Sequence, residues 1–307
     1  MKALRYLFLF STILLVACQV ETDSLIPSDT NSIQLPGNRT LSYMEYGPAD
    51  GNPVLYFHGF PTSHQEIHLF KGAELAEKYN LRLIAVDRPG YGNSGSFPGR
   101  TLTDWPDDIQ HLVTSLGLDS YSILAGSGGG PFALACAYEQ QEGLDKVVIV
   151  SGMGPVHAPE AKKGSAMLIP KAPKLILKGL SKMIVKKPAK FKANMRKGLP
   201  EVDQAILDQP EANMAMILSF QEAFSSGYLG ALEDALIYKK EWGFELSDID
   251  TKIFLWHGEK DENVKIETAR FVADQLPNCQ WEVKSEEGHI SLIYKYADEI
   301  FSQISGN

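Results

Sequence analysis

Residues 121–137, with the sequence YSILAGSGGGPFALACA, run from an apolar strand-like segment through a glycine-rich turn into an alanine-rich helix. Four glycines surround one serine, Ser127, in that turn. Such turns bind phosphate at a helix N-terminus or expose a nucleophilic serine above a sheet edge. Pro131 breaks the dinucleotide-binding pattern G-x-G-x-x-G, and the lysine of a phosphate-binding P-loop is absent. Ala125 and Gly129, two residues before and after the serine, are small enough for a tight turn, which favours the nucleophile.

Short apolar segments alternate with amphipathic helices on both sides of this stretch. The segments that indicate strands are VLYFHG, LRLIAVD, YSILAG, KVVIVSG, KIFLWHG and QWEVKS. Helices are predicted near residues 65–79, 103–117, 129–141, 265–275 and 291–304. SIQL and LSYMEYG, joined by a Pro-Gly-Asn turn, predict a β-hairpin before the first of these strands. The pattern therefore predicts an α/β fold with a mostly parallel sheet of about eight strands, covered by helices on both faces.

The alternation stops at Gly154 and resumes near residue 247. Residues 155–246 have a helical pattern rich in Lys, Met and Leu that is broken by several prolines. We expect an inserted helical cap there, between the two parts of one core, 31–154 and 247–307. Within the cap, methionines and phenylalanines suggest an adaptable apolar pocket wall, formed by Met167, Met183, Met195, Met214, Met216, Phe191 and Phe220.

The charges of the chain are unevenly distributed. The 307 residues carry a formal net charge of −9, which argues against a nucleic-acid partner because phosphate binding needs a basic surface. From Lys162 to Lys197, however, there are twelve Lys or Arg and no Asp or Glu. Lysines recur there every three or four residues among Leu, Ile and Met. This basic amphipathic segment is either the solvated outer face of the cap or a surface that contacts membrane lipid.

The first 17 residues are typical of a secretory signal peptide. Lys2 and Arg5 precede an apolar run that is too short to span a bilayer. Leu-Val-Ala-Cys, ending at Cys18, resembles the lipobox of bacterial lipoproteins, in which the cysteine is lipidated. Gln19 then favours the outer over the inner membrane of the bacterial envelope, and residues 18–30 are expected to be a polar tether.

Two cysteines remain in the expected mature chain, Cys136 and Cys279. Cys136 lies in an apolar helical segment and Cys279 in a loop far along the chain, so we expect two separate thiols rather than a disulfide. No Cys or His cluster has metal-ligand spacing, and we expect neither a metal nor a cofactor.

Two residues with acid–base chemistry follow the last two predicted strands. Asp261 comes after KIFLWHG, and His289 comes after QWEVKS. Because the carboxyl ends of parallel strands meet at one edge of a sheet, both loops should open on the same edge as Ser127. A hydroxyl needs an adjacent base to become a nucleophile, and an imidazole oriented by a carboxylate supplies one.

Four separated motifs, HGFPTS, DRPGYGNSG, AGSGGGP and the pair HGEKDENV and EGHISL, resemble those of the α/β-hydrolase superfamily. The similarity is to its cap-bearing esterase, lipase and peroxidase-like group, and it runs from about Ser32 to the C-terminus. The resemblance implies the chain order nucleophile, acid, histidine, and the pattern H-G-x-x-D selects Asp261 over its acidic neighbours. It also implies an oxyanion hole made by the backbone N–H groups of Phe60 and Gly128.

The resemblance implies a serine hydrolase that cleaves carboxylic esters or related acyl compounds through an acyl-enzyme. Dehalogenase and epoxide hydrolase relatives are disfavoured because they use an Asp nucleophile where this chain has Ser127. Peroxidase-like, carbon–carbon bond hydrolase and aminopeptidase relatives share the same triad and stay open. A binding protein that kept the fold and lost the activity is the alternative of a different class. We expect His58 and the Asp87–Gly90 turn to have structural roles.

Overall fold

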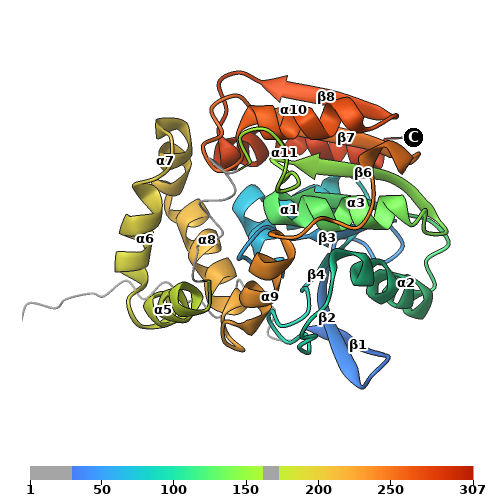
Figure 1. The fold of residues 1–307 in the computed structure, drawn as a ribbon, viewed down its shortest axis with the longest axis horizontal. Helices are drawn as coiled ribbons and strands as arrows, with labels where there is room; N and C mark the ends of the chain where they lie inside the picture. The colour runs from blue at the N-terminus through green and yellow to red at the C-terminus, as the bar shows by residue number, and fades with distance from the viewer. Residues whose placement is uncertain (1–29, 162–172, 307) are drawn as a thin grey trace, which may run out of the picture. The chain divides into compact units, whose positions relative to one another are not determined.

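The computed structural model describes residues 30–161 and 173–306 (Figure 1). Asn31–Asn307 form one compact unit, which contains both the expected core and the expected cap. The predicted signal peptide, Cys18 and the tether up to residue 29 lie outside the described residues, as do residues 162–172. No helix in the described part of the chain is long and apolar enough to cross a membrane.

An eight-stranded sheet forms the centre of this unit, in the order β1-β2-β4-β3-β5-β6-β7-β8. β1 pairs antiparallel with β2, and β2 pairs antiparallel with β4, while the remaining neighbours are parallel. The predicted, mostly parallel sheet is therefore confirmed. Its strands are β1 Asn31–Leu35, β2 Arg39–Tyr46, β3 Asn52–Phe57, β4 Leu81–Val86, β5 Tyr121–Gly126, β6 Leu144–Val150, β7 Lys252–Gly258 and β8 Cys279–Lys284.

Helices cover both faces of the sheet, as apolar parallel strands require. α1 (Gly72–Lys78) and α11 (His289–Ser305) pack against each other on one face. α2 (Trp105–Leu116), α3 (Gly130–Tyr138) and α10 (Ile266–Gln275) cover the other. The apolar residues of β3, β4 and β5 are almost completely buried between these layers.

The structure differs from the predicted helices at two places. The helix expected over 65–79 is divided at Lys71, whose φ of 57° is left-handed, into the 3₁₀ helix η2 (His64–Phe70) and α1. A Cβ on Gly72 would approach the Phe70 ring to 2.9 Å, so the two segments turn sharply where they meet. The last helix, expected near 291–304, begins at His289 itself.

Among the described residues, five α-helices lie between β6 and β7, beside the carboxyl ends of the strands, at the left and lower centre of Figure 1. We call them the cap helices. They are α5 Pro173–Lys186, α6 Pro188–Arg196, α7 Glu201–Leu207, α8 Pro210–Ala223 and α9 Leu229–Ile237. α8 packs on η2, and Ser219 of α8 accepts two hydrogen bonds from Ser63, one from its backbone N–H and one from its hydroxyl. Polar as well as apolar contacts therefore attach the cap helices to the sheet side.

A fully buried ion network also joins the two parts. Asp234 of α9 accepts a 2.9 Å hydrogen bond from Nε of Arg88 and pairs with Arg100. The other nitrogens of Arg88 donate to the carbonyl groups of His58 and Gly59, in the loop after β3. Residues 87–90, expected to be a structural turn, thus connect this loop to a cap helix.

Replacing Asp234 by alanine should leave the two guanidinium groups buried without their carboxylate. Removing one partner of a buried ion pair costs about 3 to 5 kcal/mol of unfolding free energy. Urea denaturation measures the difference. The matched control is Asp208→Ala, whose carboxylate is 54% exposed and pairs with Arg196 on the surface, where about 0 to 1 kcal/mol is expected. Equal, small losses in the two variants would contradict the role of the network.

Candidate active site

The turn between β5 and α3 holds Ser127 in a strained conformation. Its φ is +47°, in the left-handed region that non-glycine residues rarely adopt. Glycines on both sides permit this because a side chain would collide there. A Cβ on Gly129 would lie 2.3 Å from the carbonyl oxygen of Phe57, and one on Gly128 would lie 2.6 Å from Cβ of Phe60. The strain aims the serine hydroxyl out of the sheet edge, where its residue is 9% exposed.

The structure brings Ser127, Asp261 and His289 together. Nε2 of His289 lies 2.9 Å from Oγ of Ser127, and Nδ1 lies 2.7 Å from Oδ2 of Asp261. Asp261 follows β7, whereas His289 is the first residue of α11 rather than part of a loop. With Nδ1–H donating to the carboxylate, Nε2 can accept the hydroxyl proton.

The local environment holds Asp261 in its charged form. Burial acts to raise its pKa, but His289 and the backbone N–H groups of Asn263 and Val264, which donate to Oδ1 at 2.8 and 2.9 Å, hold the pKa below its ordinary value. Burial acts to lower the pKa of His289, yet the Asp261 carboxylate outweighs it, and the net pKa is raised. A base whose conjugate acid is stabilised in this way can take a proton from an alcohol.

The two backbone donors predicted for an oxyanion hole are neighbours. A Cβ atom placed on Gly128 would lie only 3.1 Å from the backbone nitrogen of Phe60. In the described part of the chain, neither N–H group donates a backbone hydrogen bond outside the helices and strands. Both groups can therefore donate to a negatively charged oxygen beside Ser127, as an oxyanion hole requires.

Neighbouring side chains hold the backbone of Gly128 and Phe60 in place. The hydroxyl of Tyr238, which follows α9, donates to the carbonyl of Gly128 at 2.8 Å, and its ring packs edge-on against Phe60. His58 is fully buried and hydrogen-bonded to the carbonyl of Gly59. Burial lowers the pKa of His58 to about 3, so its imidazole is neutral and has the structural role expected of it.

A cavity of about 610 Å³ opens beside Ser127 and His289. Its walls come from the loop after β3, from the start of α11 and from the cap helices. The apolar lining includes Phe60, Leu180, Met183, Phe191, Met195, Leu199, Met216 and Phe220. Of the predicted pocket wall, Met214 is instead exposed on α8, and Met167 lies outside the described residues.

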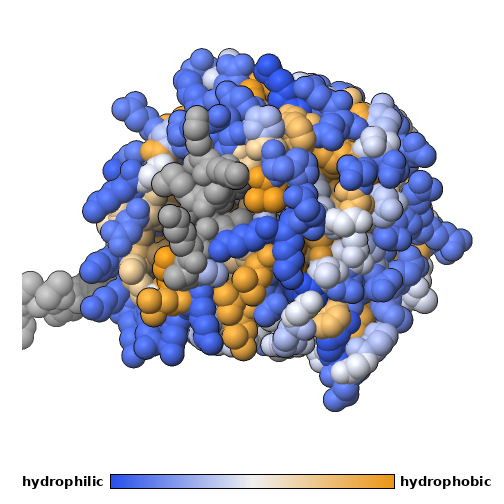
Figure 2. Space-filling view, in the orientation of Figure 1, coloured by the Kyte–Doolittle hydropathy of each residue, from blue (hydrophilic) through white to orange (hydrophobic). Residues whose placement is uncertain are grey.

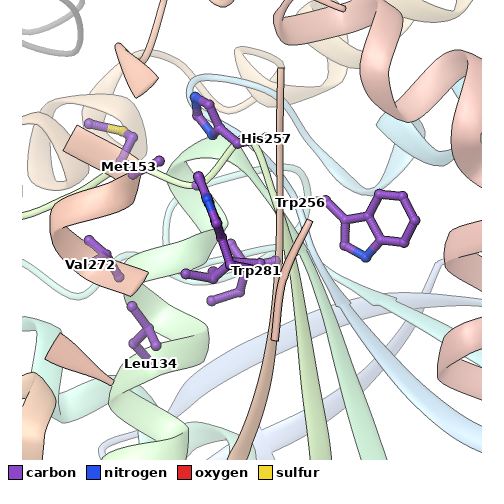
Figure 3. Close-up of a pocket in the computed structure, with 10 residues that line it drawn as sticks. Leu134, Met153, Trp256, His257, Val272 and Trp281 are labelled. Carbon is purple, nitrogen blue, oxygen red and sulfur yellow. The ribbon is translucent and has the colours of Figure 1, made fainter. Parts of the chain in front are cut away.

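A much smaller gap lies against β7, and Ser127 is not among the residues that line it (Figure 3). It measures about 10 Å³ and is lined by Leu134, Met153, Val272 and the ring of Trp281, which stacks on His257. This space is too small for a substrate. Its neighbour His257 lies 3.6 Å from Asp261 and donates a 2.9 Å hydrogen bond from Nε2 to the carbonyl of Val264, so it supports the acidic loop.

Two carboxylates near His289 belong to no sequence motif and were not identified from the sequence. Glu66 of η2 lines the cavity and accepts hydrogen bonds of 2.7 Å from the hydroxyl of Tyr56 and the N–H of Gly59. Asp203 of α7 is fully buried against the start of α11. Asp203 could not be placed from spacing because it lies 86 positions before His289, and the position of Glu66 beside the cavity depends on how η2 packs.

The two thiols are separate, as predicted, and Cys136 is buried in α3. Cys279, expected in a loop, is instead the half-buried first residue of β8. Within residues 30–161 and 173–306, no group of three or more His, Cys, Asp or Glu side chains could hold a metal ion.

These observations define the class of protein. The family model for the alpha/beta hydrolase fold matches residues 52–296, and the chain belongs to this family.

Particular relatives cover most of the chain. It is 23% identical over 233 residues to a bifunctional esterase/perhydrolase of Acinetobacter calcoaceticus, covering 74% of this chain and 80% of that protein. It is 27% identical over 267 residues to a proline iminopeptidase of Lactobacillus delbrueckii subsp. lactis, covering 81% and 87%. A solved esterase from Exiguobacterium antarcticum shares the fold with a TM-score of 0.67 and 20% identity over 90% of this chain and 97% of that chain.

We expect the imidazole of His289 to titrate above the ordinary value of 6.5, because the Asp261 carboxylate favours its charged form. The measurement is an NMR pH titration of labelled histidine side chains, with the signal assigned by its loss in His289→Gln. Asp261→Asn should lower this pKa, whereas Asp50→Asn, at an exposed carboxyl, should leave it unchanged. An unperturbed or lowered pKa in the unmodified protein would contradict the electrostatics described above.

Proposed function

We propose that the protein is a serine hydrolase that cleaves carboxylic esters or related acyl compounds through an acyl-enzyme. The observation that carries the proposal is the 2.9 Å contact between Oγ of Ser127 and Nε2 of His289, on an imidazole oriented by Asp261. A strained serine, a base with a partner carboxylate and two free backbone donors have few uses together other than acyl transfer.

In the first half of the reaction, the neutral imidazole of His289 takes the proton of Ser127 while Oγ bonds to the substrate's carbonyl carbon. The carbonyl oxygen becomes negative and accepts the N–H groups of Phe60 and Gly128. Each such donor contributes about 2.7 to 4 kcal/mol in the transition state. The bond from the carbonyl carbon to the ester oxygen then breaks, and the alcohol leaves with the proton from His289.

In the second half, water replaces the alcohol. His289 takes a proton from water as the water oxygen attacks the acyl carbon of the ester on Ser127. The intermediate releases the carboxylic acid, and the proton returns to Oγ of Ser127. Asp261 keeps its negative charge throughout and stabilises the imidazolium in both halves.

The apolar wall of the cavity favours acyl groups with a hydrocarbon chain. Met183, Met195 and Met216 are flexible side chains that adapt to different shapes, and Phe191 packs edge-on against Phe220 at 4.7 Å between ring centroids. Peroxidase-like, carbon–carbon bond hydrolase and aminopeptidase reactions use the same triad and are the second choice. A protein that binds acyl compounds without turnover is the third.

A fluorophosphonate probe tests the nucleophile. It should label the protein, and Ser127→Ala should abolish labelling and hydrolysis of p-nitrophenyl esters. Ser151→Ala is the matched control, because that hydroxyl is also buried after a neighbouring strand but contacts the carbonyl of His289 rather than its ring. Across the ester series, kcat/KM should rise by about fourfold for each methylene that the cavity buries, from about 0.8 kcal/mol of transfer free energy.

Other outcomes of this experiment would select the alternatives. Labelling that persists in Ser127→Ala would show that Ser127 is not the nucleophile. Labelling without ester hydrolysis, together with release of p-nitroaniline from a proline anilide, would favour the aminopeptidase. No labelling of the unmodified protein would favour the binding protein.

We also propose that the protein acts at the bacterial cell envelope, anchored by a lipid on Cys18 and facing the periplasm or the cell surface, on the outer rather than the inner membrane. The sequence around Cys18 supports the anchor, and several acyl chains, at about 0.8 kcal/mol per buried CH₂, would bind a membrane nearly permanently. Small ester or acyl molecules are the expected substrates.

The outer side of α5 supports a second contact with lipid. Leu175, Ile176 and Val185 are 74%, 49% and 58% exposed, and the neighbouring helix α9 exposes Leu229 and Leu236. Figure 2 shows hydrophobic surface over α5 and α9, at the lower left and lower centre. Exposed lysines are interspersed among them on α5, at positions 174, 178, 182 and 186. The inner side of the same helix lines the cavity through Leu180 and Met183, so lipid at this surface would lie next to the site.

The chain from Asn31 onward, which forms one compact unit, should bind vesicles of phosphatidylglycerol and phosphatidylcholine in equal parts but not vesicles of phosphatidylcholine alone. Reversing Lys178, Lys182 and Lys186 to Glu should weaken sedimentation with the anionic vesicles on the order of 100-fold or more, from about 1 kcal/mol per lysine. Hydrolysis of a short soluble ester should be unchanged.

The control reverses three lysines outside the cap, Lys71, Lys78 and Lys252. Equal binding by all three proteins would contradict the lipid-binding surface. In cells, the full chain should fractionate with outer membranes, and Cys18→Ser should release it to the soluble fraction.

A further inference from the structure

The helix that carries His289 has an unusual N-terminus. The first N–H groups of any helix have no partner within it, and a Ser, Thr, Asp or Asn at the N-cap usually accepts from them. Here the N-cap residue is Gly288, which has no side chain to do so. A carboxylate from the cap helices accepts instead: Asp203 of α7 receives the N–H groups of His289, Ile290 and Ser291 at 2.9, 3.0 and 2.8 Å.

The contact is closely fitted on both sides. Asp203 is fully buried, and a Cβ on Gly288 would lie 2.6 Å from each of its carboxylate oxygens. Asp203 can therefore come this close only because residue 288 has no side chain. α7 also packs directly on α11, so the carboxylate is held by its own helix rather than by a loop.

The position of the carboxylate gives it an effect on the imidazole. The charged groups around His289 are Asp261 after β7, Glu66 on η2 and Asp203 on α7, with His257 behind Asp261. Each carboxylate favours the imidazolium. Around Asp203, burial raises the carboxyl pKa, and the N–H groups of Ser291 and His289 together with the charge of His289 offset part of that effect.

We propose that Asp203 is a positioning residue for the reaction, through which the cap helices set both the orientation and the basicity of His289. The inference rests on the proposed serine hydrolase activity. The catalytic base is complete only when α7 is seated on α11, because Asp261 and Ser127 hold the ring while Asp203 holds the backbone from which the ring extends.

Asp203→Asn tests the proposal in the whole folded protein. It keeps the size of the side chain and the Oδ1 acceptor for Ile290 and Ser291, but it removes the charge and turns an amide NH₂ toward the N–H of His289. The pKa of His289, measured by NMR, should fall. The acid limb of kcat/KM should move to lower pH with it, because activity requires the neutral imidazole.

The same substitution should lower kcat for a p-nitrophenyl ester by about 10- to 100-fold, as expected for a catalytic group displaced by up to an ångström. KM should change little. The matched control is Asp208→Asn at the end of the same helix, whose carboxylate pairs with Arg196 at the surface and should leave kcat, KM and the His289 pKa unchanged.

Gly288→Ala provides a second variant from the opposite side of the contact. Its φ of −99° lies outside the left-handed region that favours glycine, and the change presses a Cβ against the carboxylate. It should lower kcat and the His289 pKa in the same direction as Asp203→Asn.

A purely structural role predicts a different result: KM rises as the cavity loosens, while the His289 pKa and the acid limb stay in place in both variants. That result would overturn the proposal. Failure of the proposed function is distinguishable, because the unmodified protein would then hydrolyse no ester while the NMR titration would still report whether Asp203 sets the pKa of His289.

Discussion

The left-handed backbone of Ser127 is the constraint on which the rest of the site depends. A non-glycine residue stays in that conformation only where the surrounding structure holds it, and the strain typically costs about 1 to 3 kcal/mol. β5 on one side and α3 on the other fix the two ends of the turn, and the carbonyl of Phe57 leaves no room for a side chain at Gly129. The hydroxyl therefore stands free of both elements, beside the N–H groups of Gly128 and Phe60.

Three contacts from the cap helices converge on the parts that surround this serine. Tyr238 holds the carbonyl of Gly128, Asp234 holds Arg88 and through it the loop before Phe60, and Asp203 holds the start of α11. Each contact fixes a different component of the proposed site: the turn of Ser127, the loop of Phe60 and the backbone of His289. The cap helices thus form a wall of the cavity and also hold the groups proposed for catalysis at its floor.

The sequence predicted the sheet well, and it selected three residues that the structure brings together, because both kinds of feature follow local rules. Apolar runs of strand length, small residues around Ser127 and polar residues after the last two strands are visible without coordinates. It failed at Lys71, where a left-handed residue divides a helix that the apolar pattern predicts as continuous. It also placed His289 in a loop, because the residue that caps its helix, Asp203, lies 86 positions away and gives no local signal.

By itself, then, the sequence determined the order of strands and helices and the identity of the residues at the sheet edge, since hydrophobic periodicity and turn chemistry act over a few neighbours. Only the tertiary structure decided which of those residues touch, how the His289 imidazole is held between the Asp261 carboxylate and the Ser127 hydroxyl, and what lines the cavity. Asp203, Glu66 and Tyr238 acquire their roles from burial against distant segments, and the free energy of a buried polar contact depends on partners that no local pattern records.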